Sequence, residues 1–434
     1  MKLLTISIYF IFIFQNMVPA QWIVQDTSHN KTLYCVYFSD ENNGWICGDQ
    51  TISRTTNSGL DWFDTGNNSR LDHVFYSMSF ADADSGYACG VKIIPDFDPT
   101  LTKYLPSYAK TGNCGDSWTF PTSWGSSQGR WRGVCFVNDN TGWLAGYMGS
   151  SGVLYKTTSG INNFDFQSNF LKQLFSCCFI DESNGWVCGK DGYISRTTDG
   201  GESWNDLNTE TELNLYSVKF IDSTYGFAVG YKSDYSEGIV LRTTDGGENW
   251  QSQILQVRML NSVFIIDKDI AWISGSEETT EGNKGIILYS SNGGSNWETQ
   301  YTSETSSAIY SIHFIDASFG WAVGASGEIL KTTTGGITSI HRETSIITSF
   351  NLSQNYPNPF NPTTTIKYSV IKESFVTIKI YNVLGKEINT LVNEKKSAGN
   401  YSVNFNGSNL PSGIYFYRMQ AGSFVSTKKF VLLK

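Results

Sequence analysis

The stretch Thr197-Thr198-Asp199-Gly200-Gly201-Glu202-Ser203-Trp204 decides the fold, because it returns almost unchanged as residues 243–250 and in weaker form elsewhere. Around it, a unit of roughly 42 residues recurs seven times between Leu33 and Gly336. One aromatic position aligns the copies: Phe38, Phe80, Phe136, Phe179, Phe220, Phe264 and Phe314. A repeat of this length predicts the blades of an all-β propeller.

Each unit carries the same punctuation after its aromatic residue. An acid usually follows two residues later, then Gly-aromatic-x-small-Gly, as in residues 44–48, and then a run that ends in Arg/Lys-Thr-Thr. The third copy has Asn138 in place of the acid, and in this alignment the sixth copy shifts to Asp267. Gly-rich corners between short alternating runs predict four strands per unit.

The corners resemble the Asp-box, or bacterial neuraminidase repeat, with its pattern Ser/Thr-x-Asp-x-Gly-x-x-Trp. An Asp, Asn or Ser can bind amides of its own turn, Gly supplies positive φ, and Trp packs beneath. A motif repeated around a ring serves the ring, so we interpret its acids as structural. With the Gly-Trp/Phe-Ala-Val-Gly strand, the repeat is similar to propellers of the photosystem II assembly and stability factor family. This resemblance implies the fold and leaves the function open.

The ring is expected to close through the start of the chain. The seventh copy has Ser339 where other copies have Trp, so its fourth strand is missing. The stretch Trp22-Ile23-Val24-Gln25 reads like the residues after other corners, such as Trp250-Gln251-Ser252-Gln253. We therefore expect it to dock as the outer strand of the last blade, which leaves no open seam.

The chain divides into four parts: residues 1–20, 21–340, 341–348 and 349–434. Residues 1–20 have Lys2, an apolar run and a small-residue cleavage site, which predicts a signal peptide. The propeller is expected over 21–340 and a linker over 341–348. No other apolar run is long enough for a membrane, so no transmembrane segment is expected in the mature chain.

Residues 349–434 carry a second set of motifs. They begin with Phe350-x-Leu352-x-Gln354-Asn355-Tyr356-Pro357-Asn358-Pro359-Phe360 and end with Lys428-Lys429-Phe430-Val431-Leu432-Leu433-Lys434. Their alternation predicts a small Ig-like β-sandwich of about seven strands, with the Pro-rich opening at an edge. The segment resembles the type A C-terminal sorting domain of the type IX secretion system. That resemblance implies the secretion machinery as a partner, and a passenger released or attached to lipopolysaccharide on the outer cell surface.

The net charge and the positions of the cysteines limit which partners, disulfides and metal sites the chain is expected to have. The net charge is −9, which argues against nucleic acid as a partner. Cys47, Cys89 and Cys188 share one repeat slot that small residues fill elsewhere, so we expect them in the core. Cys35 and Cys47 are the pair that we would test first for a disulfide. The spacing of Cys and His predicts no metal site, and no cofactor is expected.

The repeats differ from one another in the loops between second and third strands and in the connections between blades. We expect these to share one face, opposite the Asp-boxes, and to bind a ligand. Candidate ligand-binding residues are Asp96, Asp98, Trp124, Arg130, Trp131, Asp234, Tyr235 and Glu277. No catalytic residue is assigned. Arg54, Arg196 and Arg242 occupy the repeat's own Arg/Lys-Thr-Thr slot and are interpreted as structural.

Two functions remain open, because a third, a chaperone-like assembly factor by analogy with the photosystem family, is disfavoured by the export signals of the chain. The first is an exported, non-catalytic propeller that binds a polysaccharide or a protein through the variable face. The alternative is a secreted glycoside hydrolase, or a lyase, that uses acids of the loops 91–107 and 231–238. A glycosidase needs two carboxylates at a fixed separation across one bond, and a sequence does not give that separation.

Overall fold

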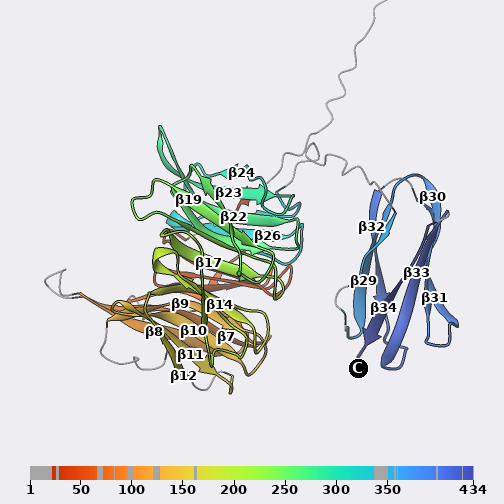
Figure 1. Cartoon of the computed structure of the whole chain (residues 1–434), viewed down its shortest axis with the longest axis horizontal. Coiled ribbons are helices and arrows are strands. Elements are labelled where there is room, and N and C mark those ends of the chain that lie inside the picture. Colours follow the sequence, from red (N-terminus) through yellow and green to blue (C-terminus); the bar gives the residue numbers. More distant parts are fainter. Residues whose placement is uncertain are drawn as a thin grey trace, which may run out of the picture. The chain divides into compact units, whose positions relative to one another are not determined.

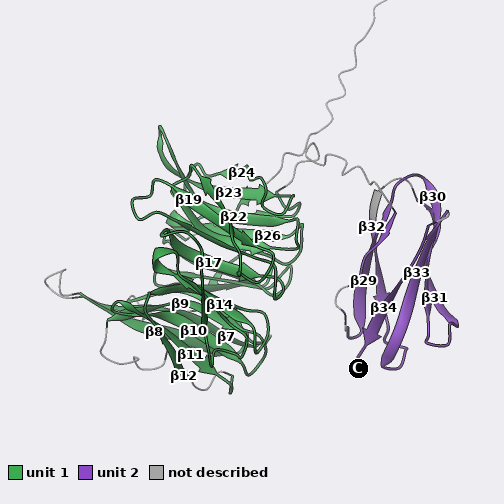
Figure 2. Ribbon diagram, in the orientation of Figure 1, with its two compact units in different colours: residues 1–339 green, residues 340–434 purple. Residues whose placement is uncertain are grey.

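The structure is a computed structural model of the chain, and it describes residues 22–25, 29–65, 72–82, 84–95, 102–120, 128–160, 164–336, 350–355, 358, 360–396, 399–422 and 424–433. The chain forms two compact units, residues 1–339 and 340–434 (Figure 2). The predicted signal peptide and linker lie outside the described residues.

The first unit is built of consecutive antiparallel sheets, which we number as blades (Figure 1). Blade 1 comprises β2 (Leu33–Phe38), β3 (Gly44–Gly48), β4 (Thr51–Thr55) and β5 (Phe63–Asp64). Blade 2 comprises β6 (His73–Phe80), β7 (Ser85–Ile94) and β8 (Lys103–Gly112). Blade 3 comprises β9 (Gly129–Phe136), β10 (Gly142–Met148), β11 (Ser151–Thr157) and β12 (Asp165–Phe170). Blade 4 comprises β13 (Leu174–Phe179), β14 (Gly185–Gly189), β15 (Ile194–Thr197) and β16 (Asn205–Leu207).

The remaining blades continue the series. Blade 5 comprises β17 (Asn214–Phe220), β18 (Gly226–Tyr231), β19 (Gly238–Thr243) and β20 (Gln251–Leu255). Blade 6 comprises β21 (Met259–Ile265), β22 (Ala271–Thr279), β23 (Gly282–Ser290) and β24 (Glu298–Thr302). Blade 7 comprises β25 (Ile309–Phe314), β26 (Gly320–Gly324), β27 (Ile329–Thr332) and, from the chain's start, β1 (Ile23–Val24). The predicted all-β seven-bladed propeller is confirmed.

The chain's start closes the ring as expected. Strand β1 pairs antiparallel with β27, with Ile23 opposite Lys331 and Val24 opposite Leu330. The Trp22 indole lies edge-on to Phe314 at 5.7 Å between ring centroids, as Trp62 lies to Phe38 at 6.0 Å in blade 1. Trp22 therefore takes the place of the tryptophan that the seventh repeat lacks.

The sixth repeat follows a different register from the one predicted. In the other blades the aligned Phe lies opposite the first Gly of the second strand, as Phe220 lies opposite Gly226. In blade 6 the residue in this position is Ile265, opposite Ala271, and Phe264 lies opposite Trp272. Asp267 is therefore in the normal acid position, and the predicted shift was wrong. The pairing has a steric reason, because a Cβ on Gly226 would come within 2.5 Å of the Phe220 ring.

Indole donors join each blade to the next around most of the ring. The Trp186 Nε1 of blade 4 donates to the Gly246 carbonyl in the corner of blade 5, at 2.9 Å. Equivalent donors from second strands to the next corner come from Trp45, Tyr87, Trp143, Trp272 and Trp321. In blade 5 the equivalent residue is Phe227, and the nearby Tyr225 hydroxyl lies 3.4 Å from the Gly293 carbonyl. Blade 7 donates to blade 1, so the series continues across the closure.

The second unit is a two-sheet sandwich, as predicted. One sheet contains β28 (Asn351–Leu352), β29 (Thr363–Val370) and β32 (Gly399–Asn406). The other contains β31 (Glu387–Lys396), β30 (Ser374–Tyr381), β33 (Gly413–Ala421) and β34 (Phe424–Leu432). Alternate residues face a shared core that includes Ile378, Tyr417 and Phe430. Phe360 from the Pro-rich opening binds the backbone of the edge strand β34, as expected.

All eight cysteines are free thiols in the structure. Cys47, Cys89 and Cys188 are completely buried, which confirms their predicted core position. Cys35 and Cys47 are direct partners across β2 and β3 but are not bonded.

Candidate functional site

One face of the propeller is built from repeated turns. Between first and second strands, the Asp222 carboxylate accepts the amides of Thr224 and Tyr225, and these turn hydrogen bonds outweigh partial burial and lower its pKa to about 2. The same position in the other blades is held by Asp40, Asp82, Asn138, Asp181, Asp267 and Asp316. Each Asp-box corner donates an amide to this turn, as Gly246 does to Thr224 at 2.7 Å. We call this the repeat face, and its acids are turn formers.

The cations of the Arg/Lys-Thr-Thr slot are also structural, as predicted. Arg196 lies over the Trp186 ring at 5.4 Å, and Arg242 donates to the Gly293 carbonyl at 2.6 Å. Arg54 lies over Trp45 and pairs with Asp116 of the next blade. Arg242 and Arg54 therefore link neighbouring blades, and Arg196 packs on the tryptophan of its own blade.

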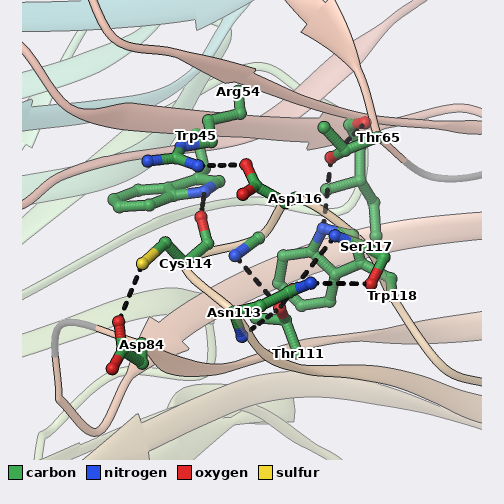
Figure 3. Close-up of polar contacts among 12 residues, drawn as sticks. Trp45, Arg54, Thr65, Asp84, Thr111, Asn113, Cys114, Asp116, Ser117 and Trp118 are labelled. Atoms are coloured by element: carbon green, nitrogen blue, oxygen red, sulfur yellow. Dashed lines mark hydrogen bonds and ion pairs between the residues drawn. The ribbon is translucent and has the colours of Figure 1, made fainter.

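The corner of blade 2 shows how an Asp-box that has lost its Asp still forms the turn and binds the neighbouring blade (Figure 3). Asn113 replaces the Asp and accepts from the Thr111 hydroxyl at 2.8 Å, while the Cys114 thiol donates to Asp84 at 2.8 Å. A hollow of about 300 Å³ borders this corner. Its lining is Lys110, Thr111, Gly112, Asn113, Ser117 and Thr119, all from the third strand, the corner and the segment after it. None of the predicted ligand-binding residues lines it.

The opposite face, which we call the variable face, carries a collar of stacked side chains around the mouth of the central channel. In each blade the pairing of the first strand has a bulge or an irregularity near its start. The residue at this irregularity lies four positions before the repeat Phe, or before Ile265 in blade 6, and we call this the bulge position. We define the collar as Tyr34, Tyr76, Arg132, Phe175, Tyr216, Tyr231, Tyr235, Arg258 and Tyr310. Six of these occupy the bulge position of their blades, and Asn261 occupies it in blade 6.

Contacts run along the collar without a break. The Tyr34 ring lies 5.0 Å from Tyr310 and 5.3 Å from Tyr76, and Arg132 lies over Tyr76 at 4.5 Å. Phe175 stacks on Tyr216 at 5.0 Å.

Beyond Tyr216 the same stacking continues into blades 5 and 6. Tyr216 stacks on Tyr231 at 4.2 Å, Tyr231 lies 5.6 Å from Tyr235, and Arg258 lies over Tyr235 at 4.7 Å. Burial raises the pKa values of Tyr34, Tyr231 and Tyr310, so their phenols are neutral donors at pH 7. The collar thus presents ring edges, phenol hydroxyls and two guanidinium groups.

Tyr235 is the most exposed ring of the collar and is held by a strained turn. Its φ is 61°, an uncommon value for a residue with a bulky side chain, and 41% of its surface is exposed. Its amide donates to the Lys232 carbonyl at 2.8 Å. Asp234 accepts from the Ser236 amide and hydroxyl, and these bonds, with Lys232 at 3.2 Å, lower its pKa. Local strain of this kind clusters at functional sites.

The structure separates the predicted ligand-binding residues into groups. Tyr235 belongs to the collar, and Arg130 donates to the Tyr76 hydroxyl at 3.2 Å beside it. Trp131 is completely buried against blade 2, with Tyr155 edge-on at 5.2 Å, so the prediction that its indole forms the rim is corrected. Asp234 shapes the turn under Tyr235, and Glu277 accepts from Thr302 at 3.4 Å. Asp96, Asp98 and Trp124 lie outside the described residues.

Several of the acids described on the variable face are engaged by neighbours. Asp72 contacts His73 at 2.7 Å and Lys92 at 3.2 Å, and Glu281 pairs with Lys284 at 2.9 Å. Glu328 is buried and accepts from the hydroxyls of Ser303, Tyr301 and Thr305. Burial raises the pKa of Asp49, whose charge acts on Tyr34 and Tyr310 of the collar. Within the described ranges, no three His, Cys, Asp or Glu residues are grouped to hold a metal ion.

Comparison with known proteins separates the two units. Residues 354–433 match the family described as secretion system C-terminal sorting domain, and residues 202–305 match photosynthesis system II assembly factor YCF48. The sorting domain indicates export to the cell surface or beyond. Across the described part of the chain, no helix is long and apolar enough to span a membrane.

Curated relatives and solved structures agree with this division. The chain is 39% identical over 54 residues to photosystem II stability/assembly factor HCF136 of Arabidopsis thaliana, which is 12% of this chain and 13% of that protein. The Guillardia theta protein of the same name is 27% identical over 76 residues, 16% of this chain and 19% of the relative. The chain therefore matches less than a fifth of the length of these two relatives.

Solved structures show the fold over a longer range. YCF48 from Cyanidioschyzon merolae superposes with a TM-score of 0.55 and 17% identity, over 72% of this chain and 98% of that one. YCF48 bound to D1 peptide gives the same score over 73% of this chain and 98% of that one, also at 17% identity. A Niastella koreensis GH74 enzyme gives 0.54 at 10% identity, over 94% of this chain and 73% of that one. The chain therefore joins a β-propeller similar to the YCF48 photosystem II assembly factors to a C-terminal sorting domain of a secretion system.

Proposed function

We propose that this protein is an exported, non-catalytic binding propeller that recognises a protein partner through the collar on its variable face. The observation that carries the proposal is the unbroken series of tyrosines and two arginines around the channel mouth. Tyrosine and arginine are enriched among the residues that carry most of the binding energy in protein interfaces.

The stacking favours a peptide segment over a sugar. A sugar ring binds best against a free aromatic face, yet one face of Tyr235 contacts Tyr231 and its ring is also covered by Arg258. Ring edges, phenol hydroxyls and guanidinium groups remain, and these suit backbone carbonyls and acidic side chains. A YCF48 propeller has been solved with D1 peptide bound, so the fold itself accepts peptides.

The glycoside hydrolase alternative has less support. It requires an acid and a second carboxylate facing one another across a bond, and several of the acids described on the variable face already bind cations or hydroxyls. The sorting domain supports delivery of the propeller to the outer surface by type IX secretion. Release into the medium and attachment to lipopolysaccharide are both compatible with that delivery.

Capture from the native cell surface tests the proposal. Mature full-length protein, biotinylated and cross-linked to intact cells, is expected to yield one recurrent surface protein, and Tyr235→Ala and Arg132→Gln are expected to abolish the capture. Phe166→Ala is the matched control, because Phe166 is 54% exposed on the outer strand β12, away from the collar.

A glycan array with the same variants decides between ligand classes. If a glycan binds and its binding depends on Tyr235, the ligand is a polysaccharide and the proposed protein partner is wrong. Release of cleavage products would support the hydrolase. Capture that all variants retain would place the interface elsewhere on the propeller.

A further inference from the structure

Below the collar, the first strands carry a second ring of channel residues. These lie one position before the repeat Phe or Ile265, and we call them the lower tier. They are Tyr37, Ser79, Cys135, Cys178, Lys219, Phe264 and His313. Positions that only build the blade framework carry the same residue types in each copy. The residue types of the lower tier differ between copies, so this position has a role beyond the framework.

Lys219 projects toward the axis of the ring. Its side chain is exposed, while its neighbours Val218 and Phe220 are buried. Its charge nevertheless acts on Cys35 of blade 1, Cys135 of blade 3 and His313 of blade 7. A side chain of blade 5 comes near all three blades only inside the central channel, so its exposed surface faces space within that channel.

No carboxylate balances this ammonium group among the described residues. Lys219 forms no ion pair with them, and neither the lower tier nor the bulge position contains Asp or Glu. Burial raises the pKa of Cys135 to about 11, so this thiol is uncharged at pH 7. A hydrogen bond with Cys47 is the main cause that lowers the pKa of Cys35, another thiol on which the charge of Lys219 acts. In a chain with a net charge of −9, a cation that no carboxylate pairs with is a candidate for binding an anion.

His313 is the blade 7 member of the same tier, and the charge of Lys219 acts on it. Its ring lies 5.0 Å from Tyr37 and 5.2 Å from Phe264, and its buried Nδ1 makes no hydrogen bond within the described residues. Burial, and then the charge of Lys219, lower the pKa of His313 to about 3. At neutral pH it is an uncharged imidazole whose Nδ1 is buried without a hydrogen-bond partner among the described residues.

We infer that the channel contains an anion site in which the Lys219 ammonium binds a carboxylate, sulfate or phosphate group beside His313. A charge-assisted hydrogen bond is favoured there because no carboxylate among the described residues competes for the ammonium group. The bound anion would offset the repulsion between Lys219 and a protonated His313. Anion binding and protonation of His313 are therefore coupled, and each strengthens the other. This site is separate from the collar and does not depend on the proposed partner.

The coupling supplies a direct readout. The His313 ring protons are followed by NMR through a pH titration of the full-length mature protein, with sodium sulfate or sodium trifluoroacetate as probes at constant ionic strength, and assigned with His313→Asn. Both probes remain anions at the pH where His313 titrates. A saturable rise in the His313 pKa is expected with at least one anion. Lys219→Met is expected to lower the affinity for that anion by about 10- to 100-fold.

Matched variants keep the result interpretable. Lys219→Arg retains the charge and is expected to keep the saturable shift, while Lys190→Met removes an exposed cation from the turn after β14 and leaves the shift unchanged. Circular dichroism checks that each variant is folded. If neither anion moves the His313 resonance, or if the shift survives in folded Lys219→Met, the anion site is refuted.

Discussion

The contact between Phe220 and Gly226 shows how the lack of a single Cβ atom determines which residues fit at this repeat position. Each Phe of this kind covers the backbone of the first Gly in the second strand, and blade 6 has exchanged both members for Ile265 and Ala271. The exchange keeps the summed volume similar, because the smaller side chain leaves room for the Cβ.

Gly226→Ala is therefore expected to destabilise the propeller by about 1 to 3 kcal/mol, because its Cβ overlaps the Phe220 ring. Ala271→Gly, at the equivalent position of blade 6, is expected to cost about 0.5 to 1 kcal/mol through backbone entropy. Urea unfolding of both variants measures the difference. Equal losses would show that the ring does not control this position.

His313 makes stability depend on pH. Its pKa is about 3 in the folded protein and near its ordinary 6.5 in the unfolded chain, so between these values the unfolded state binds the extra proton. Stability is then expected to fall as the pH drops from 6.5 toward 3, by up to about 1.4 kcal/mol per unit. Unfolding curves of wild type and His313→Asn at several pH values test this, because the variant should lack that part of the acid slope. An identical slope in both proteins would contradict it.

At the scale of the strand and its corner, the Asp-box serves as the acceptor for the preceding blade. The Trp186 indole supplies the hydrogen bond to Gly246, whereas the corner Trp297 has an Nε1 without a partner in the described residues. Substituting each tryptophan therefore compares a site that has both packing and a hydrogen bond with a site that has packing alone.

Trp186→Phe is expected to cost about 1 to 3 kcal/mol beyond Trp297→Phe, because it leaves a buried carbonyl without its donor. Both substitutions remove the same atoms, but Trp186 is completely buried and Trp297 only partly buried, so part of the difference is a larger packing loss at Trp186. Thermal and urea unfolding give the two values. A difference close to zero would mean that the indoles act through packing alone.

The elements were predictable from the sequence because turns carry strong local signals. The corner 197–204 and the first-strand aromatics predicted the blades, and the sandwich followed from its alternating strands. The collar was missed for a specific reason. Aligning blade 6 on Phe264 placed Leu260 at the bulge position, and a one-residue slip moves a side chain to the other face of a strand. With Ile265 aligned, the position reads Tyr, Tyr, Arg, Phe, Tyr, Asn, Tyr, and the channel mouth becomes visible.

For the whole molecule, the closure between β1 and β27 joins the two ends of the first unit. Trp22→Ala is expected to destabilise the ring by about 3 to 5 kcal/mol, since a buried Trp is truncated and the seam loosens. Phe63→Ala is the control, because this ring is 60% exposed on the outer strand β5 and should have little effect. Urea unfolding gives both values, and size-exclusion chromatography should show that Trp22→Ala associates through the freed edge. A monomer of unchanged stability would show that closure does not depend on Trp22.

The closure also sets an order of events. Ile23 pairs with Lys331, so the first strand of the propeller to be synthesised is the last to find its neighbour. Blades 1 to 6 contain their own hairpins and can form as the chain emerges, whereas completion of the circle awaits the third strand of blade 7. A chain that is threaded through a membrane from its beginning therefore remains an open, unsealed arc until nearly all of the propeller has crossed.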